Sequence, residues 1–466
     1  MTISGLAGRT GLSLPRGRAV LPSLLVLVVG LSACASYVPR PLPSRPAVAD
    51  SAERLIVDTA QLRLAPLKTI RIDPSDGFSP TEAAVLAVLN NPDLEARRRA
   101  VGVKEAQVFA SGLLPDPQIS AGVDKPVAGP DTQTAYNVSP SIDVAALLAR
   151  TNLRRAARLT AEQANLDLLW AEWGVAQQAR QLVETALAAE TRAAFLRRVR
   201  DLASDRYLRS DRALQRHDVT LQTAAADLAV KLDAETQLAT AEHDAQKARR
   251  DLNALLDLNA DVLLPLSSGS DSASYDAEAV RQALALLPQR RPDLLALQAG
   301  YGAQDANLRK AILAQFPLTS LGAAFARDPA GVGTESVSVA PALPIFNGGR
   351  GEVRTQSATR EQLRAEYQAR LEQTDAEAKN AEAELLAARA QAALLRADVP
   401  RLEALVQPAV AAYDRGDIDS QTYLTLSQNA LSRRADLDAR ELAARLAEIA
   451  LETALFLPPA ESKVTQ

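Results

Sequence analysis

Two long stretches of the chain place apolar side chains at the spacing of a coiled coil. In the first stretch, separations of 3, 4 or 7 residues join Leu166, Leu169, Trp173, Ala176, Val183, Leu187 and Ala194. In the second, similar separations join Leu431, Ala435, Leu442, Leu446, Ile449 and Phe456. Heptad spacing predicts long helices packed side by side. No proline lies between 147 and 207, whereas 352–412 contains Pro400 and Pro408, which we expect to kink or break that helix.

Two segments with alternating apolar and polar residues interrupt the helical pattern. The predicted strands are 118–124, 133–139, 317–327 and 334–340. Alternation such as Ile119, Ala121 and Val123 gives a strand one apolar face. Strands of about 9–11 residues cross an outer membrane when tilted. Four strands leave two open edges, so several copies would have to share one barrel. Soluble hairpins that cap a helical bundle are the alternative.

The chain contains an internal repeat with a period of about 200 residues. Asn91-Pro92-Asp93-Leu94 recurs as Arg291-Pro292-Asp293-Leu294, each time before a helix that ends near a proline. Further along, Tyr207-Leu-Arg-Ser-Asp211 matches Tyr413-Asp-Arg-Gly-Asp417 at an offset of 206. The ordered series of landmarks argues against chance similarity between Ala-rich helices. Each half therefore reads as helix, two strands, very long helix, turn and long helix.

The N-terminus has the pattern of an exported lipoprotein. Arginines precede an apolar run at 19–31, which has the length of a signal-peptide core and is too short to span a bilayer. Leu31-Ser32-Ala33-Cys34 follows and resembles the bacterial lipobox, in which the cysteine is acylated. A buried structural cysteine is the alternative. The Pro-rich segment after Cys34 indicates an extended tether.

Composition narrows the function further. The net charge is −4, from 52 Lys+Arg against 56 Asp+Glu, so no nucleic-acid partner is indicated. Cys34 is the single cysteine, and His217 and His243 are the two histidines. Both histidines fall on charged helical stretches, where a solvated position is expected rather than a metal site. We therefore expect no enzyme activity, no catalytic residue, no metal and no cofactor apart from the lipid on Cys34.

The sequence resembles the outer membrane factor family, the TolC-like outer membrane efflux proteins, from about Thr81 to Phe456. The most specific match is Leu343-Pro-Ile-Phe-Asn-Gly-Gly-Arg350, at the point where a strand enters a long helix. The resemblance assigns the barrel-to-helix junction to Pro344, Phe346, Asn347, Gly348 and Gly349. Proline and paired glycines permit a sharp change of direction. The first half, at 141–148, lacks the Phe-Asn pair and the glycines.

The resemblance implies a mostly helical fold with a small β part. Long helical hairpins would form an α-helical tunnel, continued by a 12-stranded transmembrane β-barrel shared by a homotrimer. The chain would then divide into a signal peptide (1–33), a lipidated extended segment (34–80), a first repeat (81–263), an equatorial linker (264–276), a second repeat (277–457) and a tail (458–466). The protein would conduct drugs, metals or other small solutes out of a tripartite efflux pump.

The resemblance also implies partners and a location. The partners would be a periplasmic adaptor, or membrane fusion protein, an inner membrane transporter, and the lipid of the outer membrane. The location would be the outer membrane of a Gram-negative bacterium, with the chain anchored by its lipid, spanning the membrane and extending into the periplasm. Ala35 after the cysteine favours outer membrane sorting within this family. A periplasm-spanning coiled-coil scaffold lipoprotein without a pore remains the alternative, although it has no need of duplicated β-hairpins.

The turns of the two helical hairpins are the candidate contact and gating sites. The resemblance places adaptor contacts at Tyr207, Arg209, Ser210, Asp211, Tyr413, Arg415 and Gly416. Asp417 and Asp419 are candidates for a periplasmic gate, because threefold symmetry turns one inward carboxylate into a ring of three. Gly416 suits a helix C-cap, and either acid also suits an N-cap of the next helix. We expect only one of the two acids to line the aperture.

Overall fold

The computed structural model describes residues 37–128, 133–268, 277–315, 318–341 and 346–457. Two units are present, Met1–Ala47 and Val48–Gln466. The described part of the first unit contains no helix or strand. The signal peptide, Cys34, Pro344 and the tail 458–466 lie outside the described residues.

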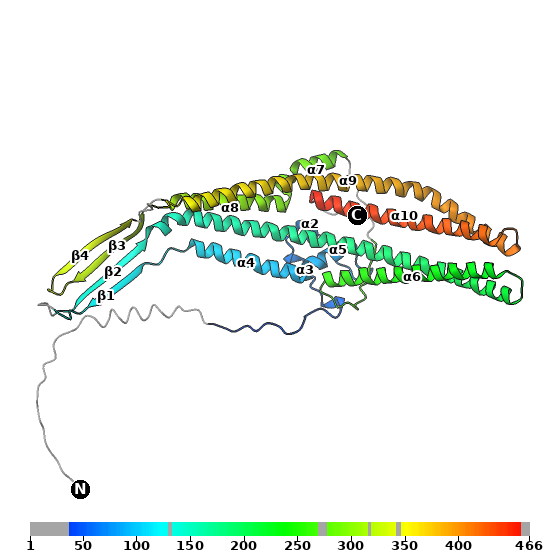
Figure 1. Ribbon diagram of the computed structural model, residues 1–466, viewed down its shortest axis with the longest axis horizontal. Coiled ribbons are helices and arrows are strands. Elements are labelled where there is room, and N and C mark those ends of the chain that lie inside the picture. The colour runs from blue at the N-terminus through cyan, green and yellow to red at the C-terminus, as the bar shows by residue number, and fades with distance from the viewer. Residues whose placement is uncertain (1–36, 129–132, 269–276, 316–317, 342–345, 458–466) are drawn as a thin grey trace, which may run out of the picture. The chain divides into compact units, whose positions relative to one another are not determined.

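Within the second unit, both halves of the chain have the predicted order of helices and strands (Figure 1). After short helical turns η2 (Ala52–Arg54), η3 (Thr59–Gln61) and α2 (Ala65–Lys68), the first half comprises α3 (Pro80–Asn90), α4 (Pro92–Gly112), β1 (Gln118–Asp124), β2 (Ala135–Asp143), α5 (Val144–Gln215) and α6 (Leu221–Leu255). The second half comprises α7 (Ala277–Arg290), α8 (Pro292–Leu313), β3 (Leu318–Arg327), β4 (Gly333–Pro341), α9 (Arg350–Arg415) and α10 (Ser420–Leu455). A mostly helical chain with a small β part is therefore confirmed.

The paired short helices are separated by the repeated X-Pro-Asp-Leu motif. The Asn91 side chain accepts a hydrogen bond from the Leu94 amide (3.1 Å) and so caps α4. Pro92 then occupies the first position of α4, where its missing N–H costs nothing. Arg291-Pro292 separates α7 from α8 in the same way. The residue before each proline is extended, which ends the preceding helix.

The two longest helices, α5 and α9, have 72 and 66 residues, or roughly 100 Å each at 1.5 Å per residue. The predicted break in α9 is wrong, because the helix continues through Pro400 and Pro408. Packing against α10 supports the helix on the N-terminal side of these prolines. Arg396 there pairs with Glu441 of α10 (2.5 Å), and Leu395 packs beside the buried Leu437. Tertiary contacts thus override a local helix breaker.

The four strands form one antiparallel sheet in the order β1-β2-β3-β4. The two hairpins are joined through β2 and β3, with Val138 opposite Phe325 and Ser141 opposite Gly322. Within the described ranges, β1 and β4 each pair with one strand, so their outer edges are open. Figure 1 shows the sheet at one end of α5 and α9 and the two helix-to-helix turns at the other end.

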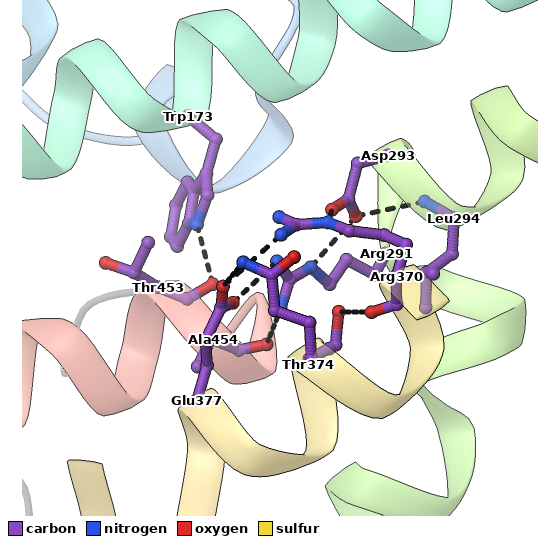
Figure 2. Close-up of polar contacts among 10 residues, drawn as sticks. Trp173, Arg291, Asp293, Leu294, Arg370, Thr374, Glu377, Thr453 and Ala454 are labelled. Carbon is purple, nitrogen blue, oxygen red and sulfur yellow. Dashed lines mark hydrogen bonds and ion pairs between the residues drawn. The ribbon is translucent and has the colours of Figure 1, made fainter. Parts of the chain in front are cut away.

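A buried ionic cluster ties the two halves together where α7, α8, α9 and α10 meet α5 (Figure 2). Arg291, whose side chain is 1 % exposed, donates to Asp293 (2.9 Å), to the Ala454 carbonyl (2.9 Å) and to Glu377 (3.2 Å). Its guanidinium also lies 4.4 Å from the centre of the Trp170 ring. The Ala454 carbonyl belongs to the C-terminal turn of α10, where a positive charge is favoured.

The first half has a weaker version of the same contact. Asn91 stands where Arg291 stands in the second half, and its Nδ2 donates to the Leu255 carbonyl at the end of α6 (3.1 Å). In both halves, the residue before the proline therefore holds the end of the last helix of its own half. The repeat is visible in tertiary contacts as well as in sequence.

Glu172 of α5 is a buried carboxylate in the apolar core of the first half. Its Oε1 accepts hydrogen bonds from Arg98 Nε (3.3 Å) and Nη2 (3.2 Å). Its Oε2 has no hydrogen-bond partner among the described residues. Burial raises the pKa of Glu172, and the charges of Arg98 and Arg63 offset this only in part.

We expect this carboxyl to make stability depend on pH. Its pKa is higher in the folded state than the ordinary 4.5, so protonation favours folding. The contribution of Glu172 to the free energy of unfolding is full below pH 4.5, and it is lost as the pH rises through the pKa of the folded state. Glu172→Gln should lack this dependence, as measured by urea unfolding at a series of pH values. Parallel pH profiles for the wild type and the variant would contradict the prediction, and Glu105→Gln of α4 is the exposed control.

Candidate functional site

One face of the sheet is apolar and exposed. Residues that lie directly opposite one another in an antiparallel sheet point to the same side. The pairing therefore gathers Ile119, Val123, Tyr136, Val138, Leu321, Phe325, Val337 and Val339 on one face. Each of these side chains is at least 40 % exposed in the single chain. The charged Arg327 and Glu335 lie on the same face, at the end of the sheet nearest the β3–β4 turn. An exposed apolar patch of this kind marks a contact with lipid or with another protein.

The opposite face of the sheet is polar or small. It carries Gln118, Ser120, Gly122, Asn137, Ser139, Ser141, Ser320, Gly322, Thr334, Ser336 and Ser338. The predicted alternation is thus confirmed for all four strands, and the paired register aligns it across the sheet. A sheet with one apolar and one polar face, both uncovered, fits strands that separate lipid from water.

The two strand-to-helix junctions differ, as their sequences indicate. In the first half β2 runs into α5 without a linker, and Asp143 caps α5 by accepting from the Ala146 amide (2.8 Å). In the second half Gly348 and Gly349 have positive φ values of 56° and 68°. A side chain at Gly349 would also meet Gln315 at 3.1 Å. Both conditions require glycine there.

Other junction residues hold this bend or project from it. The Asn347 side chain accepts from the Gly349 amide (2.6 Å), and Gln315 donates to the Gly348 carbonyl (2.7 Å). Phe346 is fully exposed. Pro344 lies outside the described residues, so its predicted role is untested.

The first helical tip lies farther along the chain than predicted. The turn between α5 and α6 comprises residues 216–220, whereas the sequence pattern predicted the tip at Tyr207 to Asp211. The second tip, 416–419, lies where predicted. Tyr207, Arg209, Ser210 and Asp211 are therefore residues of α5 itself. The sequence match paired the two tips at an offset of 206 residues, whereas the observed tips are 199 residues apart. The predicted register is therefore wrong by seven residues, which is one heptad.

The correct register reveals two nearly identical tips. Arg216 Nε donates to Asp218 (2.9 Å), and Arg415 Nε donates to Asp417 (2.8 Å). The residue between each pair has positive φ, His217 at 64° and Gly416 at 80°. Backbone amides at both tips bond back to the helix as in a Schellman C-cap. Arg216, His217 and Asp218 were missed, although a 199-residue offset shows Arg-x-Asp in both halves.

The residues predicted to contact an adaptor have mixed environments. Arg209 is exposed and pairs with Asp205 (3.6 Å), while Asp211 accepts from Gln215 (3.0 Å). Tyr207 lies beneath the Lys231 ammonium, 5.6 Å from the ring centre. Ser210 is only 8 % exposed, so its side chain is not available to a partner in this structure.

The two candidate gate acids have different partners. Asp419 caps α10, accepting from the Thr422 amide (2.7 Å). Hydrogen bonds from the Thr422 side chain and backbone lower the pKa of Asp419. Asp417 is not a cap, and it pairs with the exposed Arg415. The structure therefore gives Asp419 the capping role and leaves Asp417 as the candidate for an aperture.

A cluster not predicted from the sequence joins the two hairpins near their tips. Arg206 of α5 pairs with the buried Asp227 of α6 (2.9 Å). The same guanidinium lies 5.2 Å from the Tyr413 ring of α9 and 5.3 Å from the Tyr423 ring of α10. The two rings stack on each other at 5.4 Å. We call Arg206, Asp227, Tyr413 and Tyr423 the Arg206 cluster.

The hairpins are also joined far from the tips. Arg180 of α5 pairs with the buried Glu452 of α10, and Glu184 pairs with Arg445 (2.9 Å). A cavity of about 890 Å³, lined by α5, α6 and α10, lies between these ion pairs and the Arg206 cluster. The hairpins thus contact one another at two levels and are separated between them.

Among the residues that the structure describes, no group of His, Cys, Asp or Glu side chains could hold a metal ion. His217 and His243 are both exposed. Among the described residues, no helix has an apolar stretch long enough to span a bilayer.

Neither a protein-family model nor a curated protein sequence matches this chain. Solved structures do match. A membrane protein from Pseudomonas aeruginosa superposes with a TM-score of 0.70 at 19 % identity, covering 93 % of this chain and 100 % of that one. CusC, described as forming a transmembrane channel, superposes with a TM-score of 0.69 at 17 % identity, covering 91 % of this chain and 99 % of that one. The CmeC outer membrane channel of Campylobacter jejuni superposes with a TM-score of 0.69 at 16 % identity, covering 91 % of this chain and 94 % of that one. This chain therefore has the fold of known outer membrane channels.

Proposed function

We propose that this protein is the outer membrane channel of a tripartite efflux pump. One observation carries the proposal: a sheet with one exposed apolar face and one polar face continues into helices of roughly 100 Å. The shared fold with outer membrane channels supports it. The sheet would lie in the outer membrane and the helices in the periplasm. Solutes would leave through a passive duct without chemical change.

The open edges of the sheet support a homotrimer. β1 and β4 have unpaired outer edges, which cannot face lipid because their backbone groups would lack hydrogen bonds. Pairing β1 of one copy with β4 of the next removes both edges. Three copies of a four-stranded sheet give a 12-stranded barrel. Heat-labile trimers in detergent extracts would support this assembly, whereas a soluble monomer would support the pore-free scaffold.

The membrane position of the sheet can be tested by labelling. Ala330 is exposed in the β3–β4 turn, so Ala330→Cys should react with an impermeant maleimide on intact cells. Residue 34 would be blocked by its lipid. His217→Cys, at the opposite end of α5, is the matched control and should react only after the outer membrane is permeabilised. Labelling of Ala330→Cys only after permeabilisation would contradict the proposal.

Acylation of Cys34 is a separate part of the proposal, supported by the lipobox alone. Wild-type protein should incorporate labelled fatty acid, and Cys34→Ser should not. Absence of label in the wild type would remove the lipid anchor from the model. The channel would be unaffected, because the barrel anchors the protein independently.

The tips would meet the periplasmic adaptor, which couples the duct to an inner membrane transporter. Each protomer presents the same Arg–Asp ion pair twice, at Arg216–Asp218 and Arg415–Asp417. A trimer would thus offer six similar tips. The near-equivalence of the two tips supports a partner that contacts both in a similar way.

We expect Asp417 to control conduction and Asp419 to control helix stability. A ring of three carboxylates attracts cations, so the resting channel should be cation-selective and blocked by multivalent cations. Asp417→Ala should raise conductance in planar bilayers and weaken the block. Asp419→Ala should instead loosen the first turn of α10, seen as faster amide exchange at Thr422. If neither substitution changes conductance or block, the constriction lies elsewhere.

A further inference from the structure

The beginning of α5 has an unusual charge pattern. Residues 144–160 contain four arginines and no acidic residue, and the first acid of the helix is Glu162. Helix N-termini favour acids, and like charges four residues apart repel each other. Arg150, Arg154 and Arg158 have this four-residue spacing. The pattern therefore does not stabilise the helix, which indicates a role outside it.

Three of these arginines are exposed without a partner. Arg150 is occupied, because its Nε donates to the Gly112 carbonyl at the end of α4 (3.1 Å). Arg154, Arg155 and Arg158 are exposed, and none forms an ion pair with any residue that the structure describes. At 100° per residue they share one side of the helix. We call these three side chains the α5 arginine patch.

The patch lies just beyond the expected edge of the membrane. The nine residues of β2, tilted by about 45°, rise roughly 21 Å, so an apolar band of about 25 Å extends into the first turns of α5. Leu148, which is 57 % exposed, lies at this level. Arg154 lies about 9 Å farther along the helix. Cα–Cβ bonds in a helix tilt towards its N-terminus, so the Arg154 side chain leaves the helix in the direction of the sheet.

The second half has related features at the same level. Arg350 and Arg354 follow Arg150 and Arg154 by 200 residues, and both are exposed. Arg354 also has no ion pair within the described residues. The fully exposed Phe346 precedes them, as aromatic side chains do at membrane interfaces. An apolar residue followed by arginines thus occurs after both hairpins.

We infer that the α5 arginine patch, with Arg354, binds the phosphate groups of anionic phospholipids in the periplasmic leaflet of the outer membrane. A guanidinium can hold two phosphate oxygens at once, and arginines near an anionic surface are attracted to it. This inference rests on the proposed function, because it needs the sheet in the membrane. The bound lipid would fix the depth of the channel and support the trimer at its barrel-to-helix junction.

Titration of lipid onto the purified trimer tests the inference. Full-length protein in dodecyl maltoside is mixed with phosphatidylglycerol or phosphatidylcholine, and bound lipid is counted by native mass spectrometry. The wild type should bind phosphatidylglycerol in preference to phosphatidylcholine, and high salt should weaken the binding of phosphatidylglycerol. Arg154→Gln/Arg155→Gln/Arg158→Gln should bind it at least about tenfold more weakly, since each arginine near an anionic surface contributes to binding. Glutamine preserves helix propensity.

A second triple variant controls for net charge. Arg192→Gln/Arg198→Gln/Arg440→Gln removes three exposed arginines far from the sheet and should bind phosphatidylglycerol like the wild type. Equal binding by all three proteins would overturn the inference. The inference would also be overturned if the Arg154/Arg155/Arg158 variant changed the anion permeability of the channel and bound lipid like the wild type. The patch would then face the lumen. Failure of the proposed function is distinguishable from failure of this inference, since in the former case the protein would form no heat-labile trimer at all.

Discussion

Replacing Arg291 by methionine is expected to lower the free energy of unfolding by about 3 kcal/mol. The guanidinium is 1 % exposed and contacts two carboxylates, one carbonyl and the Trp170 ring. Methionine fills much of the volume but donates no hydrogen bond, so the Ala454 carbonyl and Glu377 each lose a partner. Removing one member of a buried charge network costs more than the net worth of the pair.

The variant should still fold, which makes the effect measurable. Arg370 also contacts Asp293 (2.8 Å), so this buried carboxylate is not left without a positive partner. Urea unfolding of the full-length protein, followed by circular dichroism, gives the change in free energy. Arg309→Met is the control, because Arg309 is exposed and its half-buried partner Asp305 keeps a second partner in Arg360, so the Arg309 pair should contribute about 0–1 kcal/mol. Similar losses for both variants would show that Arg291 has no special structural role.

Replacing Arg206 by alanine is expected to raise the resting conductance of the proposed channel several-fold. Arg206 is the residue that connects the α5–α6 hairpin to Tyr413 and Tyr423 of the other hairpin. Each cation–π contact contributes about 0.5–2 kcal/mol. Loss of about 2 kcal/mol from the arrangement in which the two hairpins are joined shifts the ratio of separated to joined tips by roughly 30-fold. Single-channel recording in planar bilayers measures the change.

Two variants separate opening from general damage. Arg197→Ala removes an exposed ion pair to Glu242 within the first hairpin, so it should leave conductance unchanged. Tyr423→Leu removes one of the two ring contacts and the ring stacking, and it should raise conductance less than Arg206→Ala. Unchanged conductance in Arg206→Ala would show that the Arg206 cluster does not hold the tips together.

The sequence alone determined the local features of this chain. Heptad spacing specified the long helices, and alternation specified the strands, because each depends on which face of an element is apolar. The X-Pro-Asp-Leu motif marked the breaks between short helices, since proline lacks an N–H and restricts the residue before it. The glycines after Asn347 marked the bend of the second junction, where positive φ excludes other residues.

Only the tertiary structure decided the register and the contacts between distant segments. Heptad sequences look alike after a shift of seven residues, so the comparison that paired Tyr207 with Tyr413 could not detect its error. The structure fixes the separation at 199, because each turn forms where the helix can cap its own end, at His217 and at Gly416. Packing against α10 also kept α9 helical through Pro400. The pairing of Arg291 with Ala454 and of Arg206 with Tyr413 joins residues more than 160 positions apart, and no local pattern specifies such a contact.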